Sequence, residues 1–301
     1  MSWGDPSRSV VLTALVATAT VTTDAQRFTS RAVGVRVDVL VTNRGQLVRG
    51  LNAHDFDVRD EGVPQTVSQV DLEQIPLNLI LVFDTSASVA GERLHGLLDA
   101  GKALLDGLRD HDRVALLSFS TRVRLLAPLT PSRQQIRAAL ETLDAHDSTS
   151  LRDAAFAGLA LREADPGRTL MLIFSDGADT SSWLTTSKVI ETAKRTDAVV
   201  YAVVVPYQRA FWTPQGRAID TVKEAGKFLE SLTEETGGRI LFASSNSDLR
   251  ATFTKTLAEF HDRYVLSYTP TGVSATGWHR LEVKVKGKSG KVTARRGYSA
   301  E

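Results

Sequence analysis

The feature that most constrains the fold is a series of short, almost unbroken apolar runs in the middle of the chain. Residues 77–83 (LNLILVF), 113–119 (RVALLSF), 169–174 (TLMLIF) and 198–205 (AVVYAVVV) are each typical of a strand covered on both faces. Segments with helical spacing separate these runs, so strands and helices alternate along the chain. The alternation continues with a short strand at residues 239–242 and a final strand at residues 264–268. It predicts an α/β domain with a doubly wound, mostly parallel sheet.

Helices are expected between these strands and after the last one. Pro131 and Ser132 are typical of a helix start, and Gly237 with Gly238 is typical of a helix end. Apolar spacing places the helices at residues 90–108, 131–143, 151–162, 185–195, 219–236 and 248–260.

Both ends of the chain are expected to form β-structure. Between residues 33 and 41 valine occupies every second position, and residues 278–285 (WHRLEVKV) alternate in the same way. Half a sheet at either end would leave an edge or a face uncovered. We therefore predict that residues 29–75 and 262–301 pair into one smaller β-sandwich-like domain, which flanks the central domain at residues 76–261.

Composition excludes several classes of protein. The 301 residues include 36 Lys and Arg against 35 Asp and Glu, a net charge of +1, which is not typical of a protein that coats nucleic acid or anionic membranes. The sequence has no cysteine, so disulfides, zinc–thiolate sites, iron–sulfur clusters and thiol catalysis are excluded.

The first 25 residues resemble a short signal peptide. Residues 10–21 (VVLTALVATATV) are apolar but too short to span a membrane, and Ala25 is a small residue before a possible cleavage point. This pattern predicts export to the periplasm or the cell exterior. The alternative is an apolar N-terminal strand or helix. No other segment is long and apolar enough to be a transmembrane helix.

Polar residues follow two of the buried strands. Asp84 ends the first run, and Asp176 comes shortly after the run at 169–174. Because parallel strands end at the same rim of a sheet, these two carboxylates should lie on one rim. A tight turn after Asp84 can aim Ser86 and Ser88 at one point, and the loop between two helices supplies Thr149.

These side chains are all hard oxygen donors, which suit Mg²⁺, Mn²⁺ or Ca²⁺ and not Zn²⁺ or copper. A cation that is held mainly by hydroxyl groups keeps much of its positive charge. An acidic side chain from another molecule would be a natural ligand for its open position. The sequence therefore predicts a metal site that can bind a partner's carboxylate.

Three motifs resemble a known family. Asp84-Thr85-Ser86-Ala87-Ser88, Thr149 in Ser-Thr-Ser-Leu-Arg-Asp-Ala, and Asp176 in Phe-Ser-Asp-Gly-Ala-Asp are similar to the metal-ion-dependent adhesion site of von Willebrand factor type A domains. The resemblance covers about residues 77–260. It implies a Rossmann-like fold and a protein-binding or adhesion function that is not enzymatic. It also implies that Ser86 and Ser88 bind the ion directly, Thr149 in one conformation only, and the two aspartates mostly through water.

The flanks resemble a bacterial group of exported proteins related to this domain. The resemblance rests on Gly50-Leu51-x-x-x-Asp55-Phe56, Tyr264-x-Leu266-x-Tyr268 and the closing Arg296-Gly297-Tyr298. One departure from the family concerns Asp147 and Ser148, which stand where glycines are common. Asp147 is interpreted as a cap for the next helix. The alternative is that its carboxylate strengthens Ca²⁺ or Mn²⁺ binding.

Two other functions stay open. Asp84 at a strand end could be the nucleophile of a metal-dependent hydrolase or phosphotransferase, although Ser86 stands where the dehalogenase-type pattern has a second aspartate. The sequence contains no Gly-x-Ser-x-Gly or His-Glu-x-x-His motif and no acid–base pair beside the metal residues. The third possibility is a structural component of an envelope assembly, in which the metal only stiffens the loops.

Three aromatic residues are candidates for partner contacts. Phe211 and Trp212 lie in the polar segment 206–218, which leaves the same rim as the metal residues, and Trp183 follows Asp179 closely. Exposed aromatic side chains often dominate the energetics of protein interfaces. The alternative is that they pack on the β-structure or on a neighbouring helix.

Overall fold

The computed structural model describes residues 34–71, 75–161, 167–205, 211–212, 218–219, 221–287 and 290–300. The predicted signal peptide at residues 1–25 lies outside these described residues. The chain divides into a unit of Met1–Ala32 and a unit of Val33–Glu301. Within the described part of the chain, no helix is long and apolar enough to cross a membrane.

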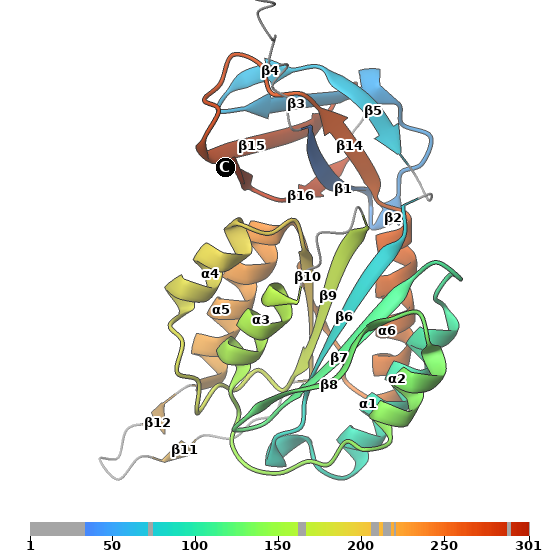
Figure 1. Cartoon of the computed structure of the whole chain (residues 1–301), viewed down its shortest axis with the longest axis vertical. Coiled ribbons are helices and arrows are strands. Elements are labelled where there is room, and N and C mark those ends of the chain that lie inside the picture. The colour runs from blue at the N-terminus through green and yellow to red at the C-terminus, as the bar shows by residue number, and fades with distance from the viewer. Residues whose placement is uncertain are drawn as a thin grey trace, which may run out of the picture. The chain divides into compact units, whose positions relative to one another are not determined.

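The central sheet has the strand order β13-β10-β9-β6-β7-β8 (Figure 1). Its strands run parallel except at the edge, where β8 is antiparallel to β7. The strands are β6 (Leu77–Asp84), β7 (Arg113–Phe119), β8 (Val123–Thr130), β9 (Arg168–Ser175), β10 (Val199–Val204) and β13 (Arg239–Phe242). The parallel strands match the predicted apolar runs to within a residue or two at each end.

Strand β8 was not predicted. Only Ala127 of its eight residues is buried, and Pro128 lies within it. Proline is tolerated at a sheet edge because one side of an edge strand needs no hydrogen-bond donors. An exposed edge strand of this kind lacks the continuous apolar signal on which the other strands were recognised.

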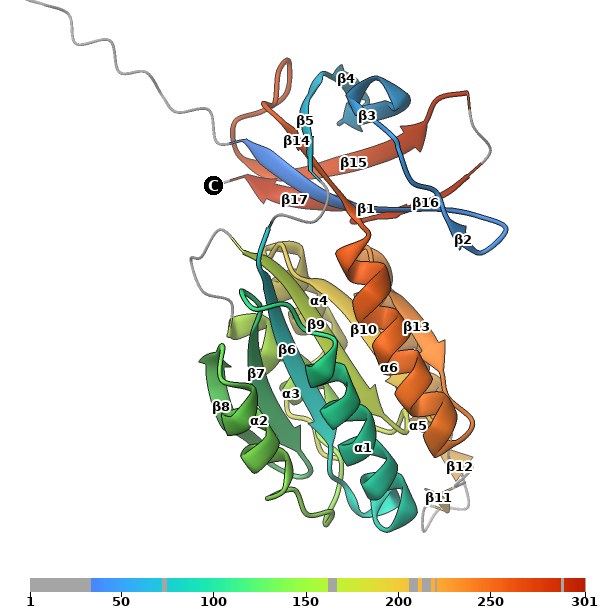
Figure 2. The same ribbon diagram turned by 90° about the vertical axis from the view of Figure 1, so that its right-hand side faces the viewer.

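Helices cover both faces of the central sheet (Figure 2). The unbroken apolar run of β6 follows from this, since Leu81 and Phe83 pack in one hydrophobic cluster and Ile80 and Val82 pack in the other. The first cluster contains buried residues of α1 (Glu92–Asp106), α2 (Arg133–Leu140) and α6 (Asn246–His261). The second contains buried residues of α3 (Leu151–Ala160), α4 (Thr186–Lys194) and α5 (Thr221–Thr236).

Strands from the two ends of the chain pair with each other in two further sheets. One sheet has the order β16-β1-β14-β5, with β2 beside β1, and the other has the order β17-β15-β3-β4. Their bounds are β1 (Val35–Asn43), β2 (Gln46–Leu47), β3 (Phe56–Asp60), β4 (Val63–Gln65), β5 (Val67–Asp71), β14 (Tyr264–Tyr268), β15 (Gly277–Val285), β16 (Lys291–Ala294) and β17 (Gly297–Ala300). Although β14 directly follows α6, it pairs with β1 and β5 and not with the central sheet.

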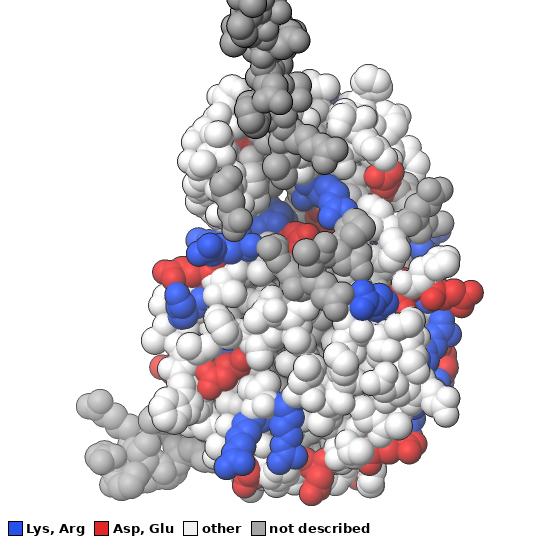
Figure 3. Space-filling view, in the orientation of Figure 1, with Lys and Arg blue, Asp and Glu red and all other residues white. Residues whose placement is uncertain are grey.

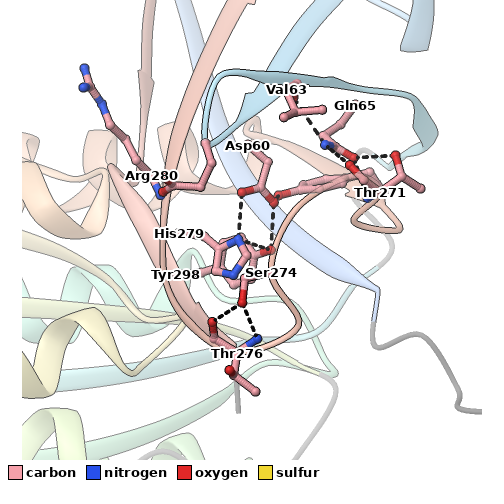
Figure 4. A network of polar contacts seen from close by, with 11 residues as sticks. Asp60, Val63, Gln65, Thr271, Ser274, Thr276, His279, Arg280 and Tyr298 are labelled. Carbon is pink, nitrogen blue, oxygen red and sulfur yellow. Dashed lines mark hydrogen bonds and ion pairs between the residues drawn. The ribbon is translucent and has the colours of Figure 1, made fainter.

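These two sheets share one hydrophobic cluster, which includes Val37 and Leu266 from the first and Val58 and Leu281 from the second. A buried polar network lies beside it (Figure 4). The Asp60 carboxylate is fully buried and accepts hydrogen bonds from the hydroxyl groups of Tyr268 and Tyr298 at 2.9 and 2.8 Å. His279 Nδ1 lies 2.9 Å from its other oxygen. The network joins β3 to three strands from the C-terminal end of the chain.

Charged side chains of both signs lie interspersed on the face shown in Figure 3. Among the described residues, several basic side chains pair with acidic ones, for example Arg296 with Glu234 and Arg137 with Asp106. This distribution agrees with the nearly balanced charge of the sequence.

Candidate metal centre

The two predicted carboxylates lie at the ends of neighbouring parallel strands. Asp84 is the last residue of β6, and Asp176 directly follows β9. Phe83 and Phe174 are partners in the β6–β9 register, so the two strands end level with each other. Both aspartates are buried, with Asp84 at 0% and Asp176 at 3% exposure.

A tight turn follows Asp84. The backbone N–H of Ser86 donates to Asp84 Oδ1 at 2.9 Å, which directs the chain back over the strand end. As a result Ser86 Oγ and Ser88 Oγ lie 3.1 Å apart. Ser86 is buried and Ser88 is half-buried, so this pair of hydroxyl oxygens lies at the boundary between the protein interior and the solvent.

Backbone hydrogen bonds hold the loop of Thr149 beside this turn. The Thr149 carbonyl accepts from the backbone N–H groups of Thr180 and Ser181 at 2.8 and 2.9 Å, and its own N–H donates to Thr180 Oγ1 at 3.0 Å. The N–H of Ala87 donates to the carbonyl of Asp147 at 3.1 Å. The structure thus brings together the three loops that carry Asp84, Thr149 and Asp176.

The interpretation of Asp147 as a helix cap is wrong. The N-cap residue of α3 is Ser150, and its side chain accepts no hydrogen bond from the first turn of the helix. The Asp147 side chain is 60% exposed and lies 3.6 Å from His146 Nε2. Asp147 has a φ of 66°, a backbone conformation that aspartate tolerates better than most residues. Its backbone carbonyl is the group that contacts the Asp84 turn.

The N-terminus of α3 is capped from another loop. The backbone N–H of Arg152 donates to Asp179 Oδ2 and to Ser182 Oγ. In return, the Asp153 carboxylate accepts from the N–H groups of Trp183 and Leu184 at 3.0 and 2.9 Å. These reciprocal bonds fasten the Thr149 loop to the loop that follows Asp176. The pattern joins residues about 30 positions apart, which single-sequence motifs do not reveal.

Ser175 is a site residue that the sequence reasoning missed. Its Oγ donates to Asp84 Oδ2 at 2.8 Å and accepts from the N–H of Gly177 at 3.1 Å. Gly177 has a φ of +82°, which favours glycine, and this allows the chain to turn directly after Asp176. The sequence offered one hint of this role, because Ser175 lies at a predicted strand end on the same rim as Asp84, where a hydroxyl group can orient a carboxylate.

The electrostatics of the site favour a cation. Burial and, to a smaller extent, the nearby Asp176 carboxylate raise the pKa of Asp84 to about 7, although the hydrogen bonds from Ser86 and Ser175 lower it. Two carboxylates in a buried place are unfavourable when both are ionised. A divalent cation beside them would offset this repulsion.

The donor set fits a hard divalent cation. Mg²⁺ takes octahedral oxygen ligands at about 2.0–2.1 Å, which places neighbouring ligand oxygens about 2.9 Å apart. The 3.1 Å between the hydroxyl oxygens of Ser86 and Ser88 is close to this spacing. Among the described residues, no group of three or more His, Asp or Glu side chains is arranged to hold a metal ion, so an ion bound here would need the hydroxyl oxygens as well.

The geometry disfavours Asp84 as a covalent nucleophile. Its side chain is fully buried, and each of its oxygens already accepts a hydrogen bond, one from Ser86 and one from Ser175. A nucleophile must be reachable by its substrate and oriented toward it. The arrangement instead suits a group that orients other ligands.

The candidate aromatic residues differ in what the structure describes. Trp183 is 92% exposed, so it does not pack on a helix or on the flanking sheets. Phe211 and Trp212 form the short strand β11 (Phe211–Trp212), which pairs with β12 (Ala218–Ile219). The side chains of Phe211 and Trp212 lie outside the described part of the chain.

Comparisons with known proteins point to one family for the central domain. The family model of the von Willebrand factor type A domain matches residues 79–178, a range that includes all five candidate metal residues. The human inter-alpha-trypsin inhibitor heavy chain H2 is 26% identical over 137 residues, which is 41% of this chain and 14% of that protein. An uncharacterized protein of Synechocystis sp. is 31% identical over 101 residues, covering 32% and 23% of the two chains. This chain therefore spans less than a quarter of the length of these relatives.

Two solved structures share the fold. A von Willebrand factor type A protein from Catenulispora acidiphila has a TM-score of 0.51 at 12% identity, covering 90% of this chain and 74% of its own. Proximal thread matrix protein 1 from the mussel byssus has a TM-score of 0.51 at 13% identity, covering 65% and 49%. Residues 79–178 thus match the von Willebrand factor type A domain in sequence, and domains of this family are commonly adhesion or protein-interaction modules.

Proposed function

We propose that this chain is a metal-ion-dependent protein-binding or adhesion module, which captures a partner's Asp or Glu carboxylate through a divalent cation. The observation that supports it most is the pair of hydroxyl oxygens of Ser86 and Ser88, 3.1 Å apart, backed by the two buried carboxylates. The cation would be Mg²⁺, with Mn²⁺ or Ca²⁺ as alternatives.

The five residues would have different roles in holding the ion. The hydroxyl groups of Ser86 and Ser88 would bind it directly, and Thr149 would bind it in one conformation of its loop. Asp84 and Asp176 would act mostly through water and supply negative charge. The bound cation would supply an electrophilic position for a carboxylate, because neutral hydroxyl ligands leave much of its charge uncompensated.

The surroundings of the site would select the partner. Trp183 is fixed at its backbone by Asp153 and exposes 92% of its surface to solvent. A large, exposed aromatic side chain on an ordered loop is a good candidate for an interface anchor. Phe211 and Trp212 are proposed as further contacts from the neighbouring loop.

We also propose the organisation of the whole chain. Residues 1–25 would be a signal peptide, and the mature protein would be periplasmic or extracellular, as in the bacterial exported group that its flanks resemble. Residues 29–75 and 262–301 would form a β-sandwich-like domain around the type A domain at residues 76–261. The antiparallel pairing of Val37 with Leu266 and of Val58 with Val283 supports this division.

Calorimetric titration of Mg²⁺ into the full chain tests the metal site. The Ser86→Ala/Ser88→Ala double variant should lose measurable Mg²⁺ binding while its thermal unfolding changes little. A matched control is Ser68→Ala/Ser274→Ala, because Ser68 donates to the carbonyl of Ser267 in β14 and Ser274 hydrogen bonds only with the backbone of Thr276 in the loop before β15. Unchanged Mg²⁺ affinity in the Ser86/Ser88 variant would contradict the proposal.

A further inference from the structure

A cavity of about 350 Å³, partly open to solvent, lies beside the candidate metal site; we call it the rim pocket. Its apolar wall consists of Phe174, Val205, Ala243 and Leu249. Its polar edge consists of Arg93 and residues 244–246. These residues come from the ends of β9, β10 and β13 and from the first turns of α1 and α6, which is the rim that carries the metal residues.

The rim pocket and the metal site share structural elements. Phe174 in the pocket wall directly precedes Ser175, whose Oγ donates to Asp84. On the other side, Arg93 Nη1 donates to the backbone carbonyl of Ser88 at 3.3 Å. The rim pocket and the metal site are therefore linked through β9 and through Arg93 at the same end of the sheet.

The chemistry of the pocket favours an apolar occupant. The polar groups at its edge already have partners within the protein: Ser244 and Ser245 hydrogen bond with Asp248, and the Asn246 amide donates to the carbonyl of Glu92. Phe174, Ala243 and Leu249 in the apolar wall are each about 1% exposed. A bound side chain would gain mainly from burial of its apolar surface.

The charge beside the pocket favours an acidic neighbour for that occupant. The Arg93 guanidinium lies between the pocket and the Ser88 loop, where it adds positive charge to that of a bound cation. A partner's carboxylate on the metal would thus be attracted by the cation and also by the positive charge of Arg93. The partner would present an acidic residue and an apolar residue together.

We propose that the rim pocket receives a large aliphatic or aromatic side chain from the partner that places its carboxylate on the metal. This inference rests on the proposed function and names the motif recognised: an acidic residue with a large apolar residue at a fixed distance from it. The volume of about 350 Å³ lies within the range of about 300–1,000 Å³ that ligand-binding pockets usually have.

The test uses a phage-displayed library of random linear heptapeptides, bound to the full chain in Mg²⁺ and eluted with a chelator. Wild-type protein should enrich peptides with an acidic residue and with Leu, Ile, Met or Phe at a fixed offset from it. Replacement of that apolar residue by alanine in the consensus peptide should weaken binding about ten- to a hundredfold, as expected for a well-filled hydrophobic pocket.

Two variants close the pocket in different ways. Ala243→Leu fills it from the wall, and Ser244→Phe narrows its mouth from an exposed position. Each should abolish the apolar preference and keep both Mg²⁺ affinity and the preference for an acidic residue. The matched control is Ala225→Leu, which enlarges an equally buried alanine in a different cavity of about 360 Å³. If Ala243→Leu does not fold, Ser244→Phe decides alone.

The outcomes separate this inference from the function on which it rests. An absence of chelator-eluted acidic peptides would overturn both. Acidic peptides without an apolar preference, or an apolar preference that survives Ser244→Phe, would overturn the rim-pocket inference and leave the metal-dependent capture of a carboxylate standing.

Discussion

The hydroxyl group of Ser175 donates to Oδ2 of Asp84 at 2.8 Å, and the backbone N–H of Ser86 donates to Oδ1 of the same carboxylate at 2.9 Å. Asp84 is thus held from two sides by residues of two neighbouring strand ends. Both bonds favour the ionised carboxylate, against the effects of burial and of Asp176. The hydrogen bonds only limit the rise, since the pKa of Asp84 still reaches about 7, and a bound cation would be needed to favour its ionised form fully.

Ser175→Ala should weaken Mg²⁺ binding although Ser175 is not a proposed ligand. Loss of its hydrogen bond leaves Oδ2 of Asp84 buried and unpaired, and loss of such an orienting partner typically reduces metal affinity about 10- to 100-fold. Calorimetric titration measures the change. The control is Ser118→Ala, a buried serine on the neighbouring strand β7. Equal Mg²⁺ affinity in both variants would show that Ser175 does not support the site.

Asp84→Asn should separate metal binding from stability. In the absence of metal the variant removes a buried negative charge that burial and Asp176 both disfavour, so its melting temperature should rise. Adding Mg²⁺ should not raise the melting temperature of the variant any further, whereas it should raise the melting temperature of the wild-type protein by binding to its folded state. Differential scanning calorimetry with and without Mg²⁺ measures both effects. A lower melting temperature in chelator would argue against repulsion between the two carboxylates.

The sequence predicted the central domain well because each of its buried strands carries a continuous apolar run. The strand β6 illustrates this, since all eight of its residues are buried. Asp84 is the last residue of this strand and therefore lies at the rim of the sheet, so the location of the candidate site follows from the fold. The edge strand β8 has no such pattern and was missed.

Other parts of the site depend on contacts between loops that are distant in sequence. Asp179 and Ser182 cap α3 from about 30 residues away, and Asp147 acts through its backbone carbonyl. Neither role depends on a local pattern, because any loop that approached the helix could supply the same groups. The fully buried Arg263, which donates to the Tyr201 hydroxyl and to the carbonyl of Gly237, is a similar case.

Asp112 should make the protein sensitive to acid. Its carboxylate accepts from the backbone N–H groups of Leu77 and Arg109 at 3.0 and 2.8 Å, and His261 Nε2 lies 3.1 Å away. Burial raises the pKa of Asp112, but the hydrogen bonds and the charge of His261 outweigh it, so the pKa lies below its usual value. A lowered pKa in the folded state stabilises the protein above about pH 4, and this stability is lost as the pH falls below that value.

Asp112→Asn should therefore lower the free energy of unfolding at pH 7 by about 1–3 kcal/mol and flatten its decline in acid. Urea unfolding between pH 3 and 7 measures both. The control is Asp110→Asn in the same loop, whose side chain is 98% exposed and which should change little. If the two variants had the same acid dependence, Asp112 would not be a source of acid sensitivity.

The Asp60 network should make the protein sensitive to alkali. Burial and the Asp60 carboxylate raise the pKa of both Tyr268 and Tyr298 well above the usual value. A raised pKa in the folded state contributes stability that is present below about pH 10. It is lost as the pH rises further, because the unfolded tyrosines release their protons first. Each such tyrosine adds a slope of about −1.4 kcal/mol per pH unit to the free energy of unfolding.

Tyr298→Phe should remove one such contribution and so reduce the loss of stability above pH 10. At pH 7 it should lower the free energy of unfolding by about 1.5–3 kcal/mol, because Asp60 stays buried with one hydrogen bond fewer. Relative to the wild-type protein, the loss should be smaller at pH 10.5 than at pH 7, because the wild-type protein has by then lost part of the contribution of Tyr298. Urea unfolding of both proteins at pH 7 and pH 10.5 measures this. An equal loss at the two pH values would show that Tyr298 is not a source of alkali sensitivity.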